Sequence, residues 1–131
     1  MDRVHESSLY QRAGGMPWFV GLVDRFYALV NSDPVLRPLY PEDLGPPRRH
    51  LALFLAQYWG GPPQYEAERG HPRLRRRHFP FPISGAERDA WMAHMTTAVR
   101  AGALSTADEA DLLGYFDSTA TALINQPAQK D

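Results

Sequence analysis

The sequence contains no cysteine, which excludes several kinds of chemistry at once. Disulfides, iron–sulfur clusters, cysteine nucleophiles and cysteine zinc sites all require this residue. Three motifs built on other residues are also missing: the H-E-x-x-H zinc motif, the G-x-S-x-G nucleophile motif and the G-x-x-x-x-G-K-S/T phosphate-binding loop. The chain has five histidines that could bind a metal or transfer protons: His5, His50, His71, His78 and His94.

The sequence also lacks a large excess of positive or negative charge, and it lacks long apolar runs. The 14 Lys and Arg residues nearly balance the 15 Asp and Glu residues, so the formal net charge is −1 and gives no reason to expect nucleic acid as a partner. No apolar run approaches the ~20 residues of a membrane helix, and Met1–Glu6 lacks the apolar core of a signal peptide. We therefore expect a cytoplasmic protein that binds neither nucleic acid nor membrane.

The length and composition suit one globular domain. Domains commonly have about 100–150 residues, and this chain has 131, of which 44% are hydrophobic and 22% are charged. A chain of this size buries about two thirds of the surface that its unfolded form exposes. We expect a single domain over residues 1–131, with one core and one pocket.

Apolar periodicity predicts an all-helical protein. Four segments have apolar residues at spacings of three and four, which is typical of a helix with one buried face, and they cover residues 17–30, 46–59, 84–102 and 105–126. Most of the twelve prolines fall between these segments and mark helix boundaries. Shorter helical pieces are predicted at 6–13, at 33–40 as an irregular or 3₁₀ turn, and at 73–78, with a long loop over 60–71.

Residues that cap helices support these boundaries. Ser84 with Glu87, and Ser105 with Asp108, have the spacing of a capping box at the start of the last two long helices. Asp33 is predicted to cap the turn that follows the first long helix.

His78 differs from the other histidines in its surroundings. It ends the basic segment Arg73–His78 and is followed at once by Phe79 and Phe81. An axial haem ligand needs a neutral imidazole in an apolar slot, with its other ring nitrogen held by an acceptor such as the carbonyl of Leu74. Neighbouring arginines would suit the two haem propionates. A histidine beside a basic run is more often a solvated surface group, however, and the local pattern alone favours that interpretation.

Three polar aromatic residues form a second candidate group. Tyr27 and Trp91 lie on or beside the buried faces of their predicted helices, and Tyr40 ends the short turn before Pro41. Several phenol and indole donors around one cavity could hold a bound oxygen-type ligand. Aromatic residues at helical spacing usually belong to the core, so spacing alone favours a structural role.

Six longer stretches make the sequence recognisable. They are Gly14-Gly15, Arg25-Phe26-Tyr27, Val35–Asp43 (VLRPLYPED), Phe54–Pro62 (FLAQYWGGP), Arg69–His78 (RGHPRLRRRH) and Glu87–Trp91 (ERDAW). In this order they resemble the truncated haemoglobins, specifically the second group or O type. The resemblance covers about residues 8–126.

This resemblance implies a shortened globin fold in which two antiparallel helix pairs sandwich haem b with its iron. It implies that His78 is the proximal iron ligand, and it gives roles to further residues on both sides of the haem. The residues implied to contact the iron-bound ligand are Tyr27, Tyr40 and Trp91; those implied to face or adjoin the haem are Leu51, Phe54 and Trp59; those considered for the propionates are His50, Tyr65 and Arg77. The segment 43–47 is about one residue shorter than the family form, which leaves the register over 43–50 open.

Three functions are compatible with these observations. The first is binding of dioxygen and other diatomic ligands at ferrous iron, in a monomer or a homodimer. The second is a haem enzyme with peroxidase or nitric-oxide dioxygenase activity that depends on an external reductase. The third is a haem-free helical interaction module that docks through its arginine cluster, which the family resemblance disfavours.

Overall fold

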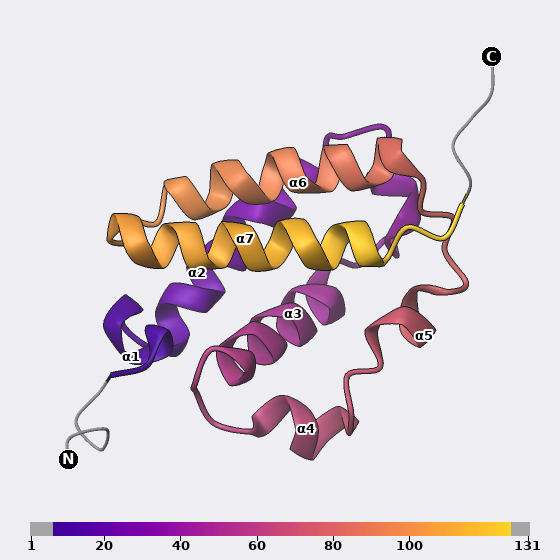
Figure 1. Cartoon of the computed structure of the whole chain (residues 1–131). Helices are drawn as coiled ribbons and strands as arrows, with labels where there is room; N and C mark the ends of the chain where they lie inside the picture. The colour runs from indigo at the N-terminus through magenta and orange to yellow at the C-terminus, as the bar shows by residue number, and fades with distance from the viewer. Residues whose placement is uncertain (1–6, 127–131) are drawn as a thin grey trace.

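A computed structural model describes residues 7–126, and every regular element that it assigns in that range is helical (Figure 1). The predicted all-α class is confirmed. The four long helices are α2 (Met16–Val30), α3 (Gly45–Tyr58), α6 (Gly85–Arg100) and α7 (Thr106–Ala122). The short elements are α1 (Leu9–Ala13), the 3₁₀ turn η2 (Arg37–Leu39), α4 (Gln64–Arg69) and α5 (Leu74–His78).

The long helices pack as two pairs, α2 with α3 and α6 with α7, and α2 also crosses α6. This is the predicted two-over-two arrangement, and α6 and α7 lie side by side in Figure 1. The core begins on α2, whose fully buried face includes Phe19, Leu22 and Phe26. These residues meet Met95 of α6 and Leu112 of α7. Burial of each such side chain contributes about 1.5–3 kcal/mol.

The turn after α2 has the predicted cap. Oδ1 of Asp33 accepts hydrogen bonds from the backbone N–H groups of Val35 (2.7 Å) and Leu36 (3.2 Å). The guanidinium of Arg37 then donates to the carbonyl oxygens of Tyr40 (3.3 Å) and of the next two residues, at 3.0 and 2.9 Å. The segment that carries Tyr40 is therefore held by side-chain hydrogen bonds to its own backbone.

Two predictions about local structure were wrong. The segment 60–71 is not a continuous loop, because α4 forms within it and buries Tyr65 edge-on against Phe54, with ring centroids 5.4 Å apart. The first helix begins at Leu9 rather than at residue 6, because the Ser8 side chain caps it; Glu6 lies outside the described residues.

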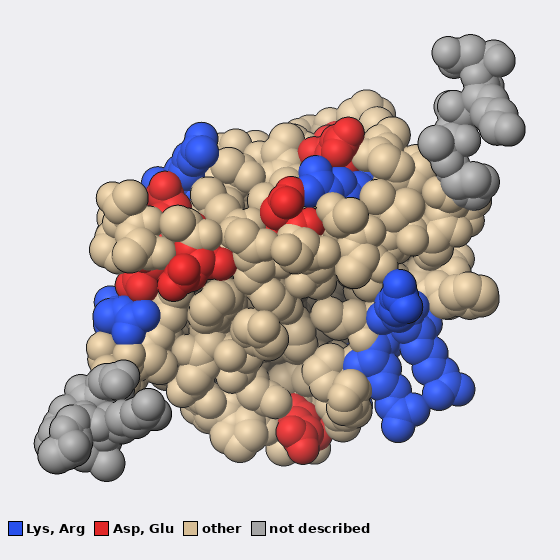
Figure 2. All heavy atoms as spheres, in the orientation of Figure 1, with Lys and Arg blue, Asp and Glu red and all other residues tan. Residues whose placement is uncertain are grey.

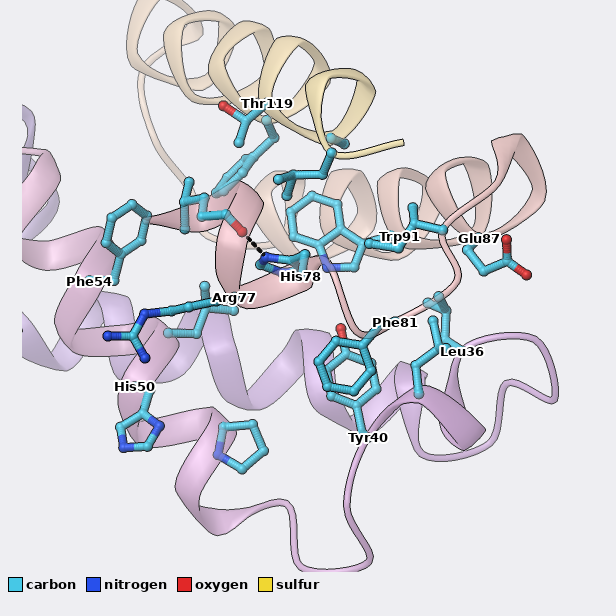
Figure 3. A pocket seen from close by; sticks show the side chains of 18 of the residues that line it. Leu36, Tyr40, His50, Phe54, Arg77, His78, Phe81, Glu87, Trp91 and Thr119 are labelled. Atoms are coloured by element: carbon cyan, nitrogen blue, oxygen red, sulfur yellow. Dashed lines mark hydrogen bonds between the residues drawn. The ribbon is translucent and has the colours of Figure 1, made fainter. Parts of the chain in front are cut away.

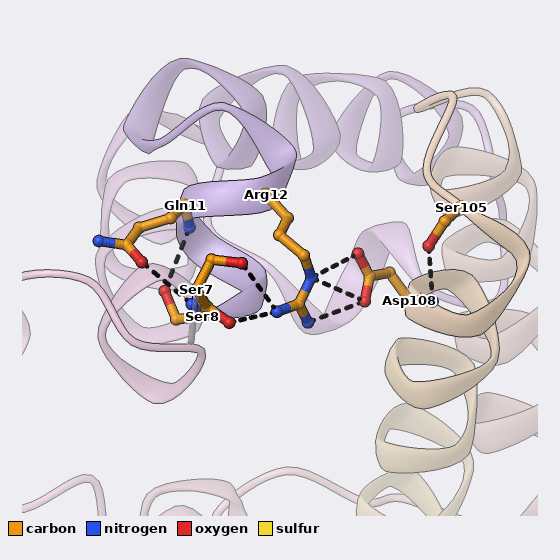
Figure 4. A network of polar contacts seen from close by, with 6 residues as sticks. All are labelled: Ser7, Ser8, Gln11, Arg12, Ser105 and Asp108. Carbon is orange, nitrogen blue, oxygen red and sulfur yellow. Dashed lines mark hydrogen bonds and ion pairs between the residues drawn. The ribbon is translucent and has the colours of Figure 1, made fainter. Parts of the chain in front are cut away.

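Of the two predicted capping boxes, the one formed by Ser84 and Glu87 is complete. The other forms only in part. The Ser105 hydroxyl accepts from the Asp108 N–H, but the Asp108 carboxylate does not accept from the Ser105 backbone N–H, so the box is incomplete. It instead accepts from Arg12 of α1, at 2.9 Å from Nη2 and 3.1 Å from Nε (Figure 4). Asp108 thus joins the first helix to the last.

Within residues 7–126, no helix is both long enough and apolar enough to cross a membrane.

Candidate functional site

A cavity of about 370 Å³ lies between the long helices and the short helices α4 and α5. Most of its wall is apolar, and the side chains that make it so include Leu36, Leu39, Leu51, Phe54, Leu55, Leu74, Ile83, Phe116 and Leu123. Polar groups enter at a few places. They include an imidazole on α5, a phenol and indole group on another wall and a basic edge, with Glu87, Arg88 and Thr119 also at the lining. An apolar slot with a few oriented polar groups is typical of a cofactor site.

His78 reaches the cavity from the last turn of α5. Its Nδ1 lies 2.7 Å from the carbonyl oxygen of Leu74, as the sequence suggested (Figure 3). A carbonyl only accepts, so Nδ1 carries the proton and donates it in this bond. In the neutral imidazole, Nε2 is then unprotonated and presents a lone pair. The bond therefore sets both the tautomer and the orientation that a metal ligand needs.

Hydrogen bonds rather than core packing hold α5 in place. No residue of α5 is buried, and its N-cap, Arg73, has a left-handed backbone with φ of 45°. The guanidinium of Arg77 donates to the carbonyls of Pro72 (2.8 Å) and Arg69 (3.0 Å). At the other end, Nδ2 of Asn125 donates to the carbonyl of His78 at 3.3 Å.

The opposite wall carries the phenol and indole group. Tyr27 is buried on α2 and lies edge-on to Tyr40, with ring centroids 5.4 Å apart. Burial raises the pKa of the Tyr27 phenol, and it raises the pKa of Tyr40 to about 12 even though Trp91 and Tyr27 interact with the Tyr40 hydroxyl. Both phenols therefore keep their protons at neutral pH. Tyr27, Tyr40 and Trp91 all line the cavity, where Tyr27 and Trp91 lie against the Tyr40 hydroxyl.

The basic edge of the cavity is formed by His50 of α3, Arg69 of α4 and Arg77 of α5. The guanidinium of Arg69 donates to Nε2 of His50 at 3.1 Å. Partial burial lowers the pKa of His50, and the positive charge of Arg69 lowers it further. Nε of Arg69 is buried and has no hydrogen-bond partner within residues 7–126. A buried, unpaired guanidinium nitrogen indicates that this edge suits an anionic group.

The structure brings nine of the ten residues of the sequence-based site to this cavity. They are Tyr27, Tyr40, His50, Leu51, Phe54, Tyr65, Arg77, His78 and Trp91. Trp59 does not line the cavity and packs behind it, with its ring 5.6 Å from that of Tyr115. Sequence reasoning missed Arg69 as a site residue, and it missed the wall that α7 supplies through Tyr115, Phe116 and Thr119.

Two packed helix pairs around an apolar slot, with an oriented imidazole on one side, define the class of haem-binding globins. Comparison with known proteins supports this conclusion. The bacterial-like globin family matches residues 8–125. The group 2 truncated hemoglobin YjbI of Bacillus subtilis is 44% identical over 110 residues, which covers 84% of this chain and 83% of that protein.

Solved structures agree. A thermostable hemoglobin from the actinobacterium Thermobifida fusca is 50% identical, with a TM-score of 0.91 over 93% of this chain and 100% of the other. The group II truncated hemoglobin from Bacillus anthracis is 33% identical, with a TM-score of 0.92 over 96% of this chain and 97% of the other. The chain therefore belongs to the bacterial-like globin family, among its group II truncated haemoglobins.

The family implies haem, and the residues of the site fit that group. Iron needs an unprotonated imidazole nitrogen, which the His78–Leu74 hydrogen bond leaves on Nε2. The porphyrin needs apolar walls, which the cavity has. The propionates need cationic partners, and the basic edge contains the unpaired Nε of Arg69.

Proposed function

We propose that this protein binds haem b in the cavity, with Nε2 of His78 as the axial ligand of iron. The observation that carries this proposal is the 2.7 Å bond between Nδ1 of His78 and the Leu74 carbonyl. Leu51 and Phe54 would contact the porphyrin and exclude water. His50, Tyr65 and Arg77 would lie near the propionates, together with Arg69.

We further propose that the bound haem takes up dioxygen and other diatomic ligands. When bound, haem would supply the iron at which such a ligand is held, and an electron-rich ligand there would favour hydrogen-bond donors. The N–H of Trp91 and the hydroxyls of Tyr27 and Tyr40 would donate hydrogen bonds to it. Two or three such bonds at about 1–2 kcal/mol each, or about 2–6 kcal/mol in total, would slow ligand release by roughly 30- to 20,000-fold. Slow release suits a sensor, a scavenger or a redox site better than a shuttle.

The test is the rate of dioxygen dissociation from the ferrous protein after replacement of the indole donor. Trp91→Phe should raise this rate about tenfold or more, since it removes one charge-assisted bond. Trp18→Phe is the matched control, because Nε1 of Trp18 donates to the Gly102 carbonyl (2.9 Å) and Trp18 does not line the cavity. An unchanged rate in Trp91→Phe would exclude this residue as a donor to the ligand.

The donor-rich wall also favours a second function, which is turnover of peroxide or nitric oxide as a peroxidase or nitric-oxide dioxygenase. Donors such as Trp91 and Tyr40 can polarise an O–O bond. This activity would require electrons from an external reductase, in the cytoplasmic setting that the absence of cysteine favours. Steady-state turnover with peroxide and a reductant, compared with free haem, tests it. A rate equal to that of free haem would leave ligand binding as the function.

A further inference from the structure

The outer face of α5 is basic and unpaired. Arg73, Arg75 and Arg76 are all exposed, and within residues 7–126 none of them forms an ion pair with a carboxylate. The nearby carboxylate of Glu68 on α4 is already engaged, at 2.6 Å from Arg49. Figure 2 shows the resulting group of basic side chains over α5. The chain as a whole has a net charge of −1, so this charge is a local feature.

A large apolar side chain adjoins these arginines. Phe79 follows α5 directly and is 78% exposed. Exposed aromatic residues beside arginine are enriched at the centres of protein interfaces, where both types make the largest contributions to binding. The α5 patch, which we define as Arg73, Arg75, Arg76 and Phe79, therefore has the composition of a docking surface.

The position of the patch suggests which partner it serves. Phe79 is joined by one peptide bond to His78, the residue proposed to bind iron. Haem iron that has lost an electron must regain one before it can bind dioxygen again. The chain has no cysteine to hold an iron–sulfur centre of its own, and an electron from a separate donor protein would have to enter through the surface near His78.

We propose that the α5 patch docks an acidic one-electron-transfer protein, and that the electron enters beside His78. This inference rests on the proposed function. One electron would pass from the reduced centre of the partner, which is oxidised, to the iron held by His78, which would be reduced from ferric to ferrous. Carboxylates of the partner would pair with Arg75 and Arg76, and Phe79 would contact an apolar spot among them.

Added salt and reversal of an arginine charge should both slow the association of the α5 patch with the partner. The arginines are exposed, so their attraction is screened over about 8 Å at physiological ionic strength. Electrostatic steering raises association rates by roughly 10- to 10³-fold and falls steeply as salt increases. The effect should depend on the site of the charge and not on the net charge of the protein.

The experiment uses the haem-loaded ferric protein and a reduced plant-type [2Fe–2S] ferredoxin, which is an acidic one-electron donor. Stopped-flow absorption measures the rate of haem reduction in Arg76→Glu and in Arg100→Glu. Arg100 is exposed and ends α6, at the opposite end of the molecule from α5 in Figure 1, and its replacement changes the charge equally. We expect about a tenfold slower reduction in Arg76→Glu and less than a twofold change in Arg100→Glu.

Equilibrium binding gives a readout that does not depend on electron transfer. Titration calorimetry with oxidised ferredoxin should show a Kd about tenfold weaker for Arg76→Glu than for the parent, and a smaller loss for Phe79→Ser. Added salt should remove the difference between Arg76→Glu and the parent.

Equal effects of Arg76→Glu and Arg100→Glu, or a rate that does not respond to salt, would overturn the proposal. Binding of the parent to phosphatidylglycerol vesicles without any response to ferredoxin would overturn it in favour of a membrane surface. Failure of the proposed function gives a different result. In that case the purified protein would show no haem spectrum, or its haem would not be reduced by dithionite.

Discussion

The wall of the cavity that carries Tyr27 and Trp91 is made of core helices, whereas the wall that carries His78 is a short helix held by hydrogen bonds. α2 has six buried residues, and Tyr27 itself is only 3% exposed. α5 has no buried residue and is five residues long. Packing thus sets the position of the donors, but it does not set the position of the proposed iron ligand.

The difference has a physical consequence for the protein without its cofactor. A helix of one or two turns is unstable by itself, because it forms too few hydrogen bonds to offset the free-energy cost of nucleation. The bonds from Arg77 and Asn125 must therefore keep α5 in place. Haem bound to His78 would add a further constraint on this side, whereas α2 and α6 are already fixed by the core.

The largest expected effect follows directly from that contrast. Addition of haem to the apoprotein should slow amide hydrogen exchange over residues 72–83 by about 100-fold or more, because ligand binding stabilises the segments that it fixes. Amides of α2 that exchange by local opening should change by less than about threefold. Mass spectrometry of peptides from both regions measures the two effects together. Equal protection in both regions would show that the two walls do not differ in this way.

A somewhat smaller effect is expected from Asn125→Ala. Nδ2 of Asn125 donates to the carbonyls of His78 (3.3 Å) and Phe81 (2.9 Å), and Oδ1 accepts from the Ile83 N–H (2.9 Å). Loss of these bonds should cost about 1–3 kcal/mol on the His78 side and speed haem loss to an acceptor protein roughly tenfold.

The control for Asn125→Ala is Asn31→Ala, which removes a hydrogen bond to Arg37 on the other side of the cavity. It should leave the rate of haem loss within about twofold of the parent. The dioxygen dissociation rate should stay near the parent value in Asn125→Ala. A change in dioxygen release without faster haem loss would contradict the division of roles between the two walls.

The smallest effect is expected away from both walls, at the part-buried ion pair that joins α1 to α7. The Arg12 guanidinium holds the pKa of Asp108 below its usual value. This pair therefore stabilises the fold above the unfolded pKa of about 4, and its contribution is lost as the pH falls through the lower folded pKa. Asp108→Asn should lower the Tm at pH 7 by roughly 2–4 °C, with the difference shrinking in acid.

Thermal unfolding followed by circular dichroism between pH 7 and pH 3 measures this effect. Haem loss and dioxygen release should not change in Asp108→Asn, because neither Asp108 nor Arg12 lines the cavity. A Tm difference that is constant over this pH range would show that the charge of Asp108 contributes little.

Much of the fold was predictable because its long helices are amphipathic and are bounded by proline or capping residues. α4 was not, since Gly60–Pro63 predicts a break and only the packing of Tyr65 against Phe54 explains the helix that follows. The carboxylate of Asp108 was assigned to a local cap, but its partner Arg12 is 96 residues away in the chain. Long-range pairs of this kind leave no periodic signal.

The site was predictable to a different degree on each wall. Helical spacing made the Leu74 carbonyl a candidate partner for His78, although the local pattern alone favoured a solvated histidine; the structure shows their hydrogen bond. The α7 wall was missed because Phe116 and Thr119 have the same spacing whether they face a core or a cavity. The resemblance to a known family, more than the residues alone, selected haem binding among the alternatives.

The central claim is that His78 binds the iron of a haem held in this cavity. The most direct test is the visible absorption spectrum of the protein expressed with haem, compared with His78→Gly and with His71→Gln as a control at an exposed histidine. The parent and His71→Gln should show the same intense haem band; His78→Gly should lose or shift it, and added imidazole should restore it. A colourless parent that takes up no haem, or a His78→Gly spectrum identical to that of the parent, would contradict the claim.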